Sequence, residues 1–245
     1  MASIADQVAL VTGGTSGYGK ATAKLLVEEG VKVIIASFDS EDVLQSVQQE
    51  IGCDSYFHMN VIKPEDWEAV YDFVRSKYDR LDMLLNIAGG GVSVVDTAEQ
   101  PLDKIDYNIK LNLYNVIYGS RIFAPMMRSQ KRGTIINFAS VCAKAAWPGW
   151  SVYAAAKWGV LGFSKGLYTE LQPDNIRVTC VIPAAASTGF QKATSGVNPA
   201  EFAELKLRPE DVARVVVDTC KLPPHVVVEE VTVWGIDQVV VPFSR

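Results

Sequence analysis

Short runs of β-branched and aliphatic residues alternate with longer segments of mixed polarity along most of the chain. The short runs are nearly continuously apolar, which is typical of strands buried on both faces of a parallel sheet. The longer segments repeat apolar residues at helical spacing, as in 20–29, 64–77 and 152–171. The predicted strands are 7–12, 31–36, 54–60, 81–86, 133–139, 176–182 and 225–234.

Residues that favour helix starts support this alternation. Acidic residues follow Ser40, and Pro64 is followed by Glu65 and Asp66. We therefore predict an α/β fold, a doubly wound (Rossmann-type) parallel sheet of about seven strands, in a single domain over 1–245. Ligands of such sheets bind outside the carboxyl ends of the strands, so candidate functional residues are sought directly after each strand.

Composition narrows the class of partner. The chain has 245 residues, a formal net charge of −5 and a pI near 5.2, which argues against nucleic acid or an anionic membrane. Four widely spaced cysteines match neither a disulfide framework nor a zinc pattern, and two histidines make a metal site improbable. The N-terminus has no basic residues before its apolar stretch, so no signal peptide is expected and the predicted location is cytoplasmic.

A glycine-rich turn follows the first predicted strand and opens a helix. Glycines allow a tight turn and a close approach to a pyrophosphate, and the helix N-terminus offers N–H groups. The spacing G-x-x-x-G-x-G differs from G-x-G-x-x-G, and a plain glycine-rich turn is the alternative. The candidate cofactor residues here are Thr12, Gly13, Thr15, Ser16, Gly17, Tyr18 and Gly19.

The residues directly after the second strand indicate which cofactor is bound. An acidic residue there favours the ribose of NAD, and a basic residue favours the 2′-phosphate of NADP. Ser37 and Phe38 are neither, and Asp39 would repel a 2′-phosphate. The prediction is NAD, with NADP not excluded. After the third strand, Asn60 and Val61 are candidates for the adenine edge.

The stretch "SVYAAAKWG" places Tyr153 four residues before Lys157, on one face of a predicted helix. One interpretation is a core tyrosine with a snorkelling lysine; the other is a proton-transfer pair.

Taken in order, T-G-x-x-x-G-x-G, N-x-A-G, a mid-helix Asn, a Ser that ends strand five and Y-x-x-x-K resemble the short-chain dehydrogenase/reductase family, small single-domain type. The resemblance runs from about residue 7 to 240. It implies a catalytic tetrad and a framework beside the cofactor. The tetrad is Asn112, Ser140, Tyr153 and Lys157, and the framework is Asn86, Ala88 and Gly89.

The chain departs from the family pattern at three places, none of them in the tetrad. Ile87 replaces the second Asn of N-N-A-G, Ala184 follows Pro183 where Gly is common, and the glycine-rich ending of many acyl-carrier-type reductases is absent. The substrate is therefore not named by analogy.

In this interpretation Tyr153 is the acid/base for the substrate oxygen, and Lys157 lowers the tyrosine pKa and holds the nicotinamide ribose. Ser140 holds the substrate oxygen. Asn112 holds a water that links Lys157 to solvent.

Substrate choice is predicted to come from three loops, which are residues 90–96, residues 141–150 and the segment after the sixth strand. Trp147 and Trp150 favour an apolar or ring-bearing substrate, although surface or subunit-interface roles fit them equally well. Residues 184–207 are a predicted substrate lid. Pro183 and Thr188, at its start, are counted among the cofactor contacts.

The resulting hypothesis is an NAD(P)-dependent oxidoreductase acting on a secondary alcohol or its ketone. An epimerase or dehydratase with the same Tyr–Lys pair and a non-catalytic nucleotide-sensing protein are the alternatives. The family resemblance also implies a homodimer or homotetramer built on the helices around 104–127 and 152–171.

Overall fold

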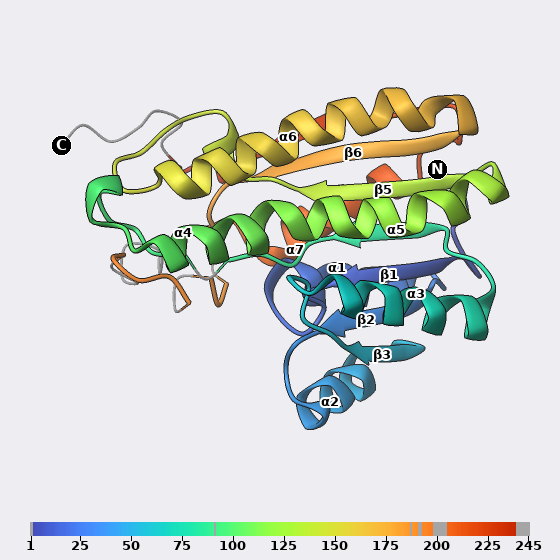
Figure 1. The fold of residues 1–245 in the computed structure, drawn as a ribbon. Coiled ribbons are helices and arrows are strands. Elements are labelled where there is room, and N and C mark those ends of the chain that lie inside the picture. Colours follow the sequence, from blue (N-terminus) through green and yellow to red (C-terminus); the bar gives the residue numbers. More distant parts are fainter. Residues whose placement is uncertain (1, 91, 187, 191–192, 198–204, 239–245) are drawn as a thin grey trace.

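A computed structural model describes residues 2–90, 92–186, 188–190, 193–197 and 205–238. Seven strands in this part of the chain form one parallel sheet in the order β3-β2-β1-β4-β5-β6-β7 (Figure 1). The strands are β1 (Val8–Thr12), β2 (Lys32–Ser37), β3 (Ser55–His58), β4 (Met83–Asn86), β5 (Gly133–Phe138), β6 (Ile176–Pro183) and β7 (Glu230–Val233). The strand order reverses between β1 and β4, which confirms the predicted doubly wound fold.

Helices connect successive strands, as right-handed parallel crossovers require. They are α1 (Gly17–Glu28), α2 (Glu41–Ile51), α3 (Pro64–Tyr78), α4 (Leu102–Ile109), α5 (Asn115–Gln130), α6 (Ser151–Leu171) and α7 (Pro209–Cys220). A π-helical turn, η2 (Lys110–Tyr114), joins α4 to α5. Among the described residues, no helix combines the length and the apolarity needed to cross a bilayer.

Two hydrophobic clusters of buried residues pack against the sheet, and Figure 1 shows helices on both of its faces. Adjacent strand residues alternate between them, with Leu10 in one cluster and Val11 in the other. The helices α1, α2 and α7 contribute buried residues to the first cluster alone, α3 to the second alone, and α5 and α6 to both. Because both faces are covered, the strands need apolar side chains on both sides, which explains their continuous apolar runs.

The last strand is shorter than predicted. Only Glu230–Val233 pairs with β6, whereas a strand was predicted over 225–234. Two prolines precede this stretch, and the N–H of Val226 closes a turn onto the carbonyl of Pro223. The guanidinium of Arg177 donates to the carbonyl of Leu222 at 3.0 Å. The backbone polar groups of this part of the chain therefore form hydrogen bonds in a turn rather than in the sheet.

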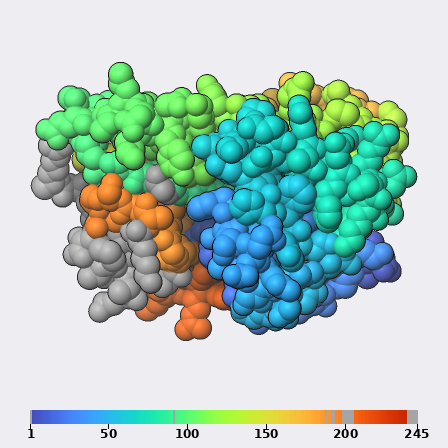
Figure 2. All heavy atoms as spheres, turned by 60° about the horizontal axis from the view of Figure 1, so that its bottom comes forward, coloured from blue at the N-terminus to red at the C-terminus, as the bar shows by residue number. Residues whose placement is uncertain are grey.

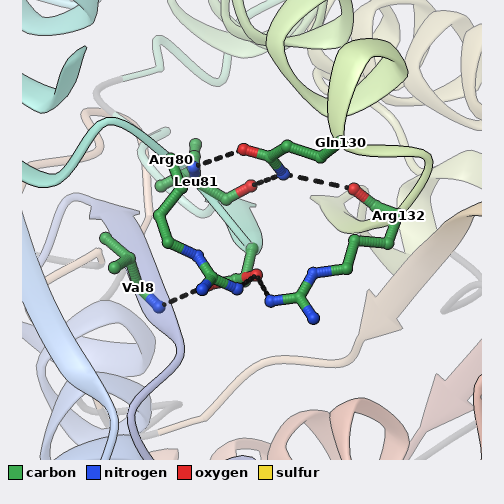
Figure 3. A network of polar contacts seen from close by, with 6 residues as sticks. Val8, Arg80, Leu81, Gln130 and Arg132 are labelled. Carbon is green, nitrogen blue, oxygen red and sulfur yellow. Dashed lines mark hydrogen bonds and ion pairs between the residues drawn. The ribbon is translucent and has the colours of Figure 1, made fainter.

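A polar network joins β1 and β4 at their amino ends (Figure 3). The buried carboxylate of Asp82 accepts the N–H of Val8 at 2.9 Å and guanidinium N–H groups of Arg80 at 2.5 Å and Arg132 at 2.7 Å. Beside it, the Gln130 amide bonds both the N–H and the carbonyl of the residue before Asp82, at 3.0 and 2.8 Å. These bonds fix the register of the two strands whose other ends shape the candidate site.

Candidate active site

The turn between β1 and α1 is shaped by glycines. Gly13 and Gly17 have φ angles of +67° and +50°, a region that residues with a Cβ disfavour. A Cβ on Gly19 would overlap the carbonyl oxygen of Gly13. Ser16 is the N-cap of α1, but its side chain makes no capping hydrogen bond. The first N–H groups of α1 are thus not capped by Ser16, and this turn fits the pyrophosphate of a dinucleotide.

Thr12 joins the ends of β1 and β4 where the strand order reverses. Its hydroxyl accepts the N–H groups of Ile87 at 3.0 Å and Ala88 at 3.1 Å and donates to the carbonyl of Leu85 at 3.3 Å. These bonds hold Ala88 against Gly13, whose hypothetical Cβ would lie 3.1 Å from the Ala88 Cα. Thr12 and Ala88 therefore form the framework of the glycine turn.

The segment after β6 reaches the same turn. The Tyr18 hydroxyl donates to the carbonyl of Ala184 at 2.8 Å, directly after Pro183 ends β6. The side chain of Thr188 lies 3.5 Å from the position that a Cβ on Gly17 would take. Four of the predicted cofactor residues, Gly17, Tyr18, Pro183 and Thr188, thus lie at one edge of the site.

An acidic group is fixed at the end of β2. The Asp39 carboxylate accepts hydrogen bonds from the Thr15 hydroxyl at 2.5 Å and the Ser37 hydroxyl at 2.6 Å. Thr15 belongs to the glycine turn, so these bonds tie Asp39 to it. Phe38 is 72% exposed. The predicted ribose residues are therefore brought together, with a flat apolar ring presented beside them.

Asn60 and Val61 are placed differently from each other. The Asn60 side chain closes the turn into α3 by accepting the N–H of Ile62 at 3.3 Å. Val61 is buried in a hydrophobic cluster, and its carbonyl accepts the indole N–H of Trp67 at 2.9 Å. The Val61 side chain is thus committed to the core rather than turned to the site.

Asn86 lies at the centre of a buried polar string. Its amide N–H₂ donates to Asn137 at 2.9 Å and to the Ser120 hydroxyl at 3.3 Å, and Asn137 in turn donates to Ser164 at 3.0 Å. The string links β4, β5, α5 and α6 across the interior. These bonds hold the end of β4 in place.

Asn112 is fully buried where the helix widens into the π-helical turn η2. Its side chain accepts the N–H of Gly90 at 3.0 Å and donates to the Asn108 carbonyl at 3.2 Å. Asn115, which the sequence reasoning missed, donates to the carbonyl of Ala88 at 2.8 Å. The i, i+4, i+7 spacing of the three asparagines on an aliphatic helix was the available signal.

Lys157 and Asn112 converge on the glycine that follows β4. The Lys157 ammonium donates to the carbonyl of Phe138 at 3.0 Å. A Cβ on Gly89 would lie 3.4 Å from the Lys157 Nζ and 3.0 Å from the Asn112 Oδ1. The same Nζ lies 5.6 Å from the centre of the Tyr153 ring.

Ser140 and Tyr153 complete the predicted tetrad. The Ser140 hydroxyl accepts the N–H of Cys142 at 3.2 Å, and it lies near enough to the Tyr153 phenol to lower its pKa. Tyr153 is only 8% exposed. The structure therefore brings all four predicted side chains together, in contact directly or through Gly89 and its neighbour Gly90.

Burial is the largest influence on the pKa values of Tyr153 and Lys157. It raises the pKa of Tyr153 well above the usual value for a phenol, while the nearby Ser140 hydroxyl lowers that pKa in part. It lowers the pKa of Lys157 to about 8. The sequence-based expectation was a tyrosine pKa lowered by Lys157, whereas burial, the largest cause, raises that pKa in this structure.

Aromatic rings cover Tyr153. The Trp150 ring meets it at a centroid distance of 5.6 Å and the Phe190 ring at 5.8 Å, and these two rings lie nearly parallel to each other, 6.3 Å apart. Trp147 packs on the same cluster. Phe190 was not singled out from the sequence.

Of the predicted lid over 184–207, residues 187, 191–192 and 198–204 lie outside the described residues. Figure 2 shows the described part (orange) at the surface, near the green region that includes α4.

Comparisons with known proteins identify the family to which the chain belongs. The short chain dehydrogenase family profile matches residues 7–197. An uncharacterized oxidoreductase of Staphylococcus aureus strain MRSA252 is 33% identical over 235 residues, which cover 95% of this chain and 99% of the relative.

Solved structures give the same result. The closed form of serine dehydrogenase complexed with NADP+ matches with a TM-score of 0.89 and 25% identity, over 95% of this chain and 96% of the other. A 3-ketoacyl-(acyl-carrier-protein) reductase from Brucella melitensis complexed with NADH matches with a TM-score of 0.83 and 26% identity, over 93% and 97%. With this fold, glycine turn and profile match, the chain belongs to the short chain dehydrogenase family and is an oxidoreductase of that family.

Proposed function

We propose that the chain transfers a hydride between a nicotinamide dinucleotide and a secondary alcohol or its ketone, with an apolar or ring-bearing substrate. The observation that carries this proposal is the grouping of Ser140 with the buried side chains of Tyr153 and Lys157 beside the glycine turn. The cofactor, when bound, gives or accepts the hydride at the substrate carbon. The uncapped start of α1 supports pyrophosphate binding there.

In the direction of ketone reduction, the Tyr153 phenol gives its proton to the carbonyl oxygen as the hydride arrives at the carbon. Burial keeps this phenol protonated at neutral pH, because its pKa is raised, and a neutral phenol is the form that a proton donor needs. Ser140 holds the oxygen through its hydroxyl. Lys157 and Asn112, which converge on Gly89, orient the cofactor and carry the replacement proton.

The proposed cofactor is NAD. This choice rests on Asp39, whose carboxylate is held at the end of β2 by two hydroxyl groups. A 2′-phosphate placed near this carboxylate would meet a like charge at short range. The relatives with solved structures include complexes with NADP+ and with NADH, so the family alone does not decide between them.

The test combines binding with turnover. We expect NADH to bind more tightly than NADPH when reduced-nicotinamide fluorescence is followed, and NADH to be oxidised when apolar ketones are added. Tyr153→Phe should lower kcat by about 10²–10⁴-fold, the range for a lost general acid, and leave NADH affinity unchanged. Full activity in this variant would refute the assignment of Tyr153.

The same assay separates the alternatives. A nucleotide-sensing protein would bind NADH without turning over any ketone or alcohol. An epimerase or dehydratase would convert its substrate with no net change in NADH. Neither cofactor binding at all would overturn the interpretation of the glycine turn.

Assembly and location are separate proposals. Leu102, Tyr107, Tyr114 and Trp158 are exposed on α4, η2 and α6, the helices expected to form a homodimer or homotetramer. Light scattering coupled to gel filtration would measure the state directly. Action in the cytoplasm stays a prediction.

A further inference from the structure

Phe190 lies in the centre of the candidate site although it comes from the segment after β6. Its ring packs between Trp150 and Tyr153, at centroid distances of 6.3 and 5.8 Å. On another side it reaches the loop after β4, where a Cβ on Gly90 would lie 3.2 Å from the ring. A benzyl group of the chain itself thus fills the space above the phenol.

The backbone around Phe190 is held on both sides. Its N–H donates to the Thr188 hydroxyl at 3.2 Å, and its carbonyl accepts the Thr194 hydroxyl at 2.8 Å. Further along, Ser195 forms a backbone bridge to the loop after β4, with the N–H of Val94 donating at 2.9 Å and the carbonyl of Val92 accepting at 3.1 Å. The position of the ring is therefore set by hydrogen bonds as well as by packing.

The groups that surround the ring are apolar. The cluster consists of Val92, Cys142, Tyr153 and Ala154, with Val94, Trp147, Trp150 and Phe190 packed against it. None of these eight residues carries a formal charge at neutral pH. A carboxylate or phosphate in their place would be desolvated without a counter-ion among them, whereas a flat apolar ring would meet the aromatic faces that Phe190 meets now.

A substrate oxygen that receives the Tyr153 proton must come within hydrogen-bond distance of that hydroxyl. Tyr153 is 8% exposed with Phe190 in place, so a substrate of more than a few atoms requires the Phe190 ring to move. We propose that Phe190 is a specificity-determining gate, whose ring holds the place that the flat, uncharged ring of an aryl ketone takes on the Trp150 face. This inference rests on the proposed function and names its substrate class.

The consequence for affinity follows from population arithmetic. If the closed position of Phe190 dominates, the KM of a ring-bearing substrate is raised by the inverse of the open fraction. Phe190→Ala removes the obstacle, and a closed fraction of about 90% would then make the KM for acetophenone fall by about tenfold. The KM for acetone, which has no ring to seat, should change much less. Trp150→Ala removes the platform and should raise the KM for acetophenone.

Thiol labelling gives a readout that needs no turnover. Cys142 belongs to the cluster that Phe190 covers, so Phe190→Ala should speed its alkylation by iodoacetamide in the native protein, as followed by peptide mass spectrometry. Phe73→Ala is the matched control, because Phe73 is a half-buried phenylalanine on α3 that packs on Phe57, outside this cluster. It should leave both the labelling rate and the two KM values unchanged.

The outcomes separate the two proposals. Faster Cys142 labelling with a lower acetophenone KM supports the gate. Unchanged labelling, or an acetophenone KM that rises in Phe190→Ala, overturns it and makes the ring a fixed wall. If the unaltered protein reduces neither ketone, the proposed function fails in this assay, while the labelling rates still decide whether Phe190 covers the site.

Discussion

At the amino ends of β1 and β4, Asp82 is enclosed by groups that satisfy it, whereas at the carboxyl ends of the same strands polar groups are left with unused hydrogen-bonding capacity. Asp82 accepts one backbone N–H and two guanidinium groups. At the other end, the ammonium of Lys157 has three donors and bonds the Phe138 carbonyl with one. Ser16 likewise leaves the first N–H groups of α1 uncapped.

The difference separates stability from ligand binding within one sheet. A closed network gains its full hydrogen-bond energy in the folded chain alone. Donors held in place without partners lose that energy until a ligand supplies acceptors, and they are already oriented when it arrives. Changes at the amino end should therefore move the free energy of unfolding, and changes at the carboxyl end should move cofactor affinity or turnover.

The largest expected effect is that of Gly19→Ala. The new Cβ would overlap the Gly13 carbonyl oxygen, and since both atoms belong to backbone-fixed positions, the turn must separate from α1. NADH affinity measured by fluorescence titration should fall by at least about 100-fold, or about 2.7 kcal/mol. Gly166→Ala is the control, because open space surrounds Gly166 on α6; affinity equal to the control in Gly19→Ala would contradict the described turn.

Asp82→Ala should come next, and act on stability. It removes the acceptor of the Val8 N–H and of two guanidinium groups, so urea unfolding should show a loss of about 2–3 kcal/mol, the range for hydrogen bonds to a charged group. Asp106→Ala, which removes an exposed pair with Lys110, should cost within about 0.5 kcal/mol. The turnover number of Asp82→Ala should equal that of the unaltered protein; a fall in kcat without a fall in stability would remove the contrast between the two ends.

The third effect is a pH dependence of stability assigned to Lys157. The pKa of this buried ammonium is about 8 in the folded chain, against an ordinary value of 10.5. Between these values the unfolded chain holds more protons, so this residue makes the free energy of unfolding rise with pH, by up to about 1.4 kcal/mol per unit. The penalty for burying the charged form is thus fully present below pH 8.

Comparison with Lys157→Met isolates this contribution, because the other titrating groups cancel in the difference. From pH 7 to pH 8 the difference in unfolding free energy should be nearly flat, and from pH 8 to pH 10 the unaltered protein should gain on the variant. A difference that stays flat to pH 10 would mean that the Lys157 pKa is not lowered by folding.

Local pattern was enough to predict much of the fold. Continuous apolar strands, the glycines after β1 and the four-residue spacing of Tyr153 and Lys157 are properties of neighbouring residues, and they predicted the sheet, the turn and the shared face of α6. Where the chain turns at Pro223, the same local reasoning extended β7 too far, since the Arg177 bonds that hold this stretch come from a distant strand.

The rest depended on contacts between remote segments. Phe190 and Tyr153 are 37 positions apart, and although Phe190 falls within the predicted lid over 184–207, nothing in the sequence distinguishes it from its neighbours there. The engagement of Lys157 by the Phe138 carbonyl likewise needs the packing of α6 on β5. Burial of Tyr153, which comes from the same remote packing, raises its pKa, and the spacing of Tyr153 and Lys157 alone gave no sign of that burial. Asn108 and Asn115 could have been predicted from the sequence, because their spacing places them on the same helix face as Asn112.

The four cysteines of the chain have a practical consequence. All four are buried and free, and burial raises the pKa of Cys220 to about 12 and that of Cys142 to about 11, so few thiolates are present at neutral pH. Each thiol then reports the opening of its own neighbourhood: Cys53 after α2, Cys142 beneath the aromatic rings, Cys180 in β6 and Cys220 at the end of α7. The alkylation rate of each native cysteine thus measures local unfolding in one of four separate regions of the fold. No further cysteine has to be engineered for this measurement in the native state.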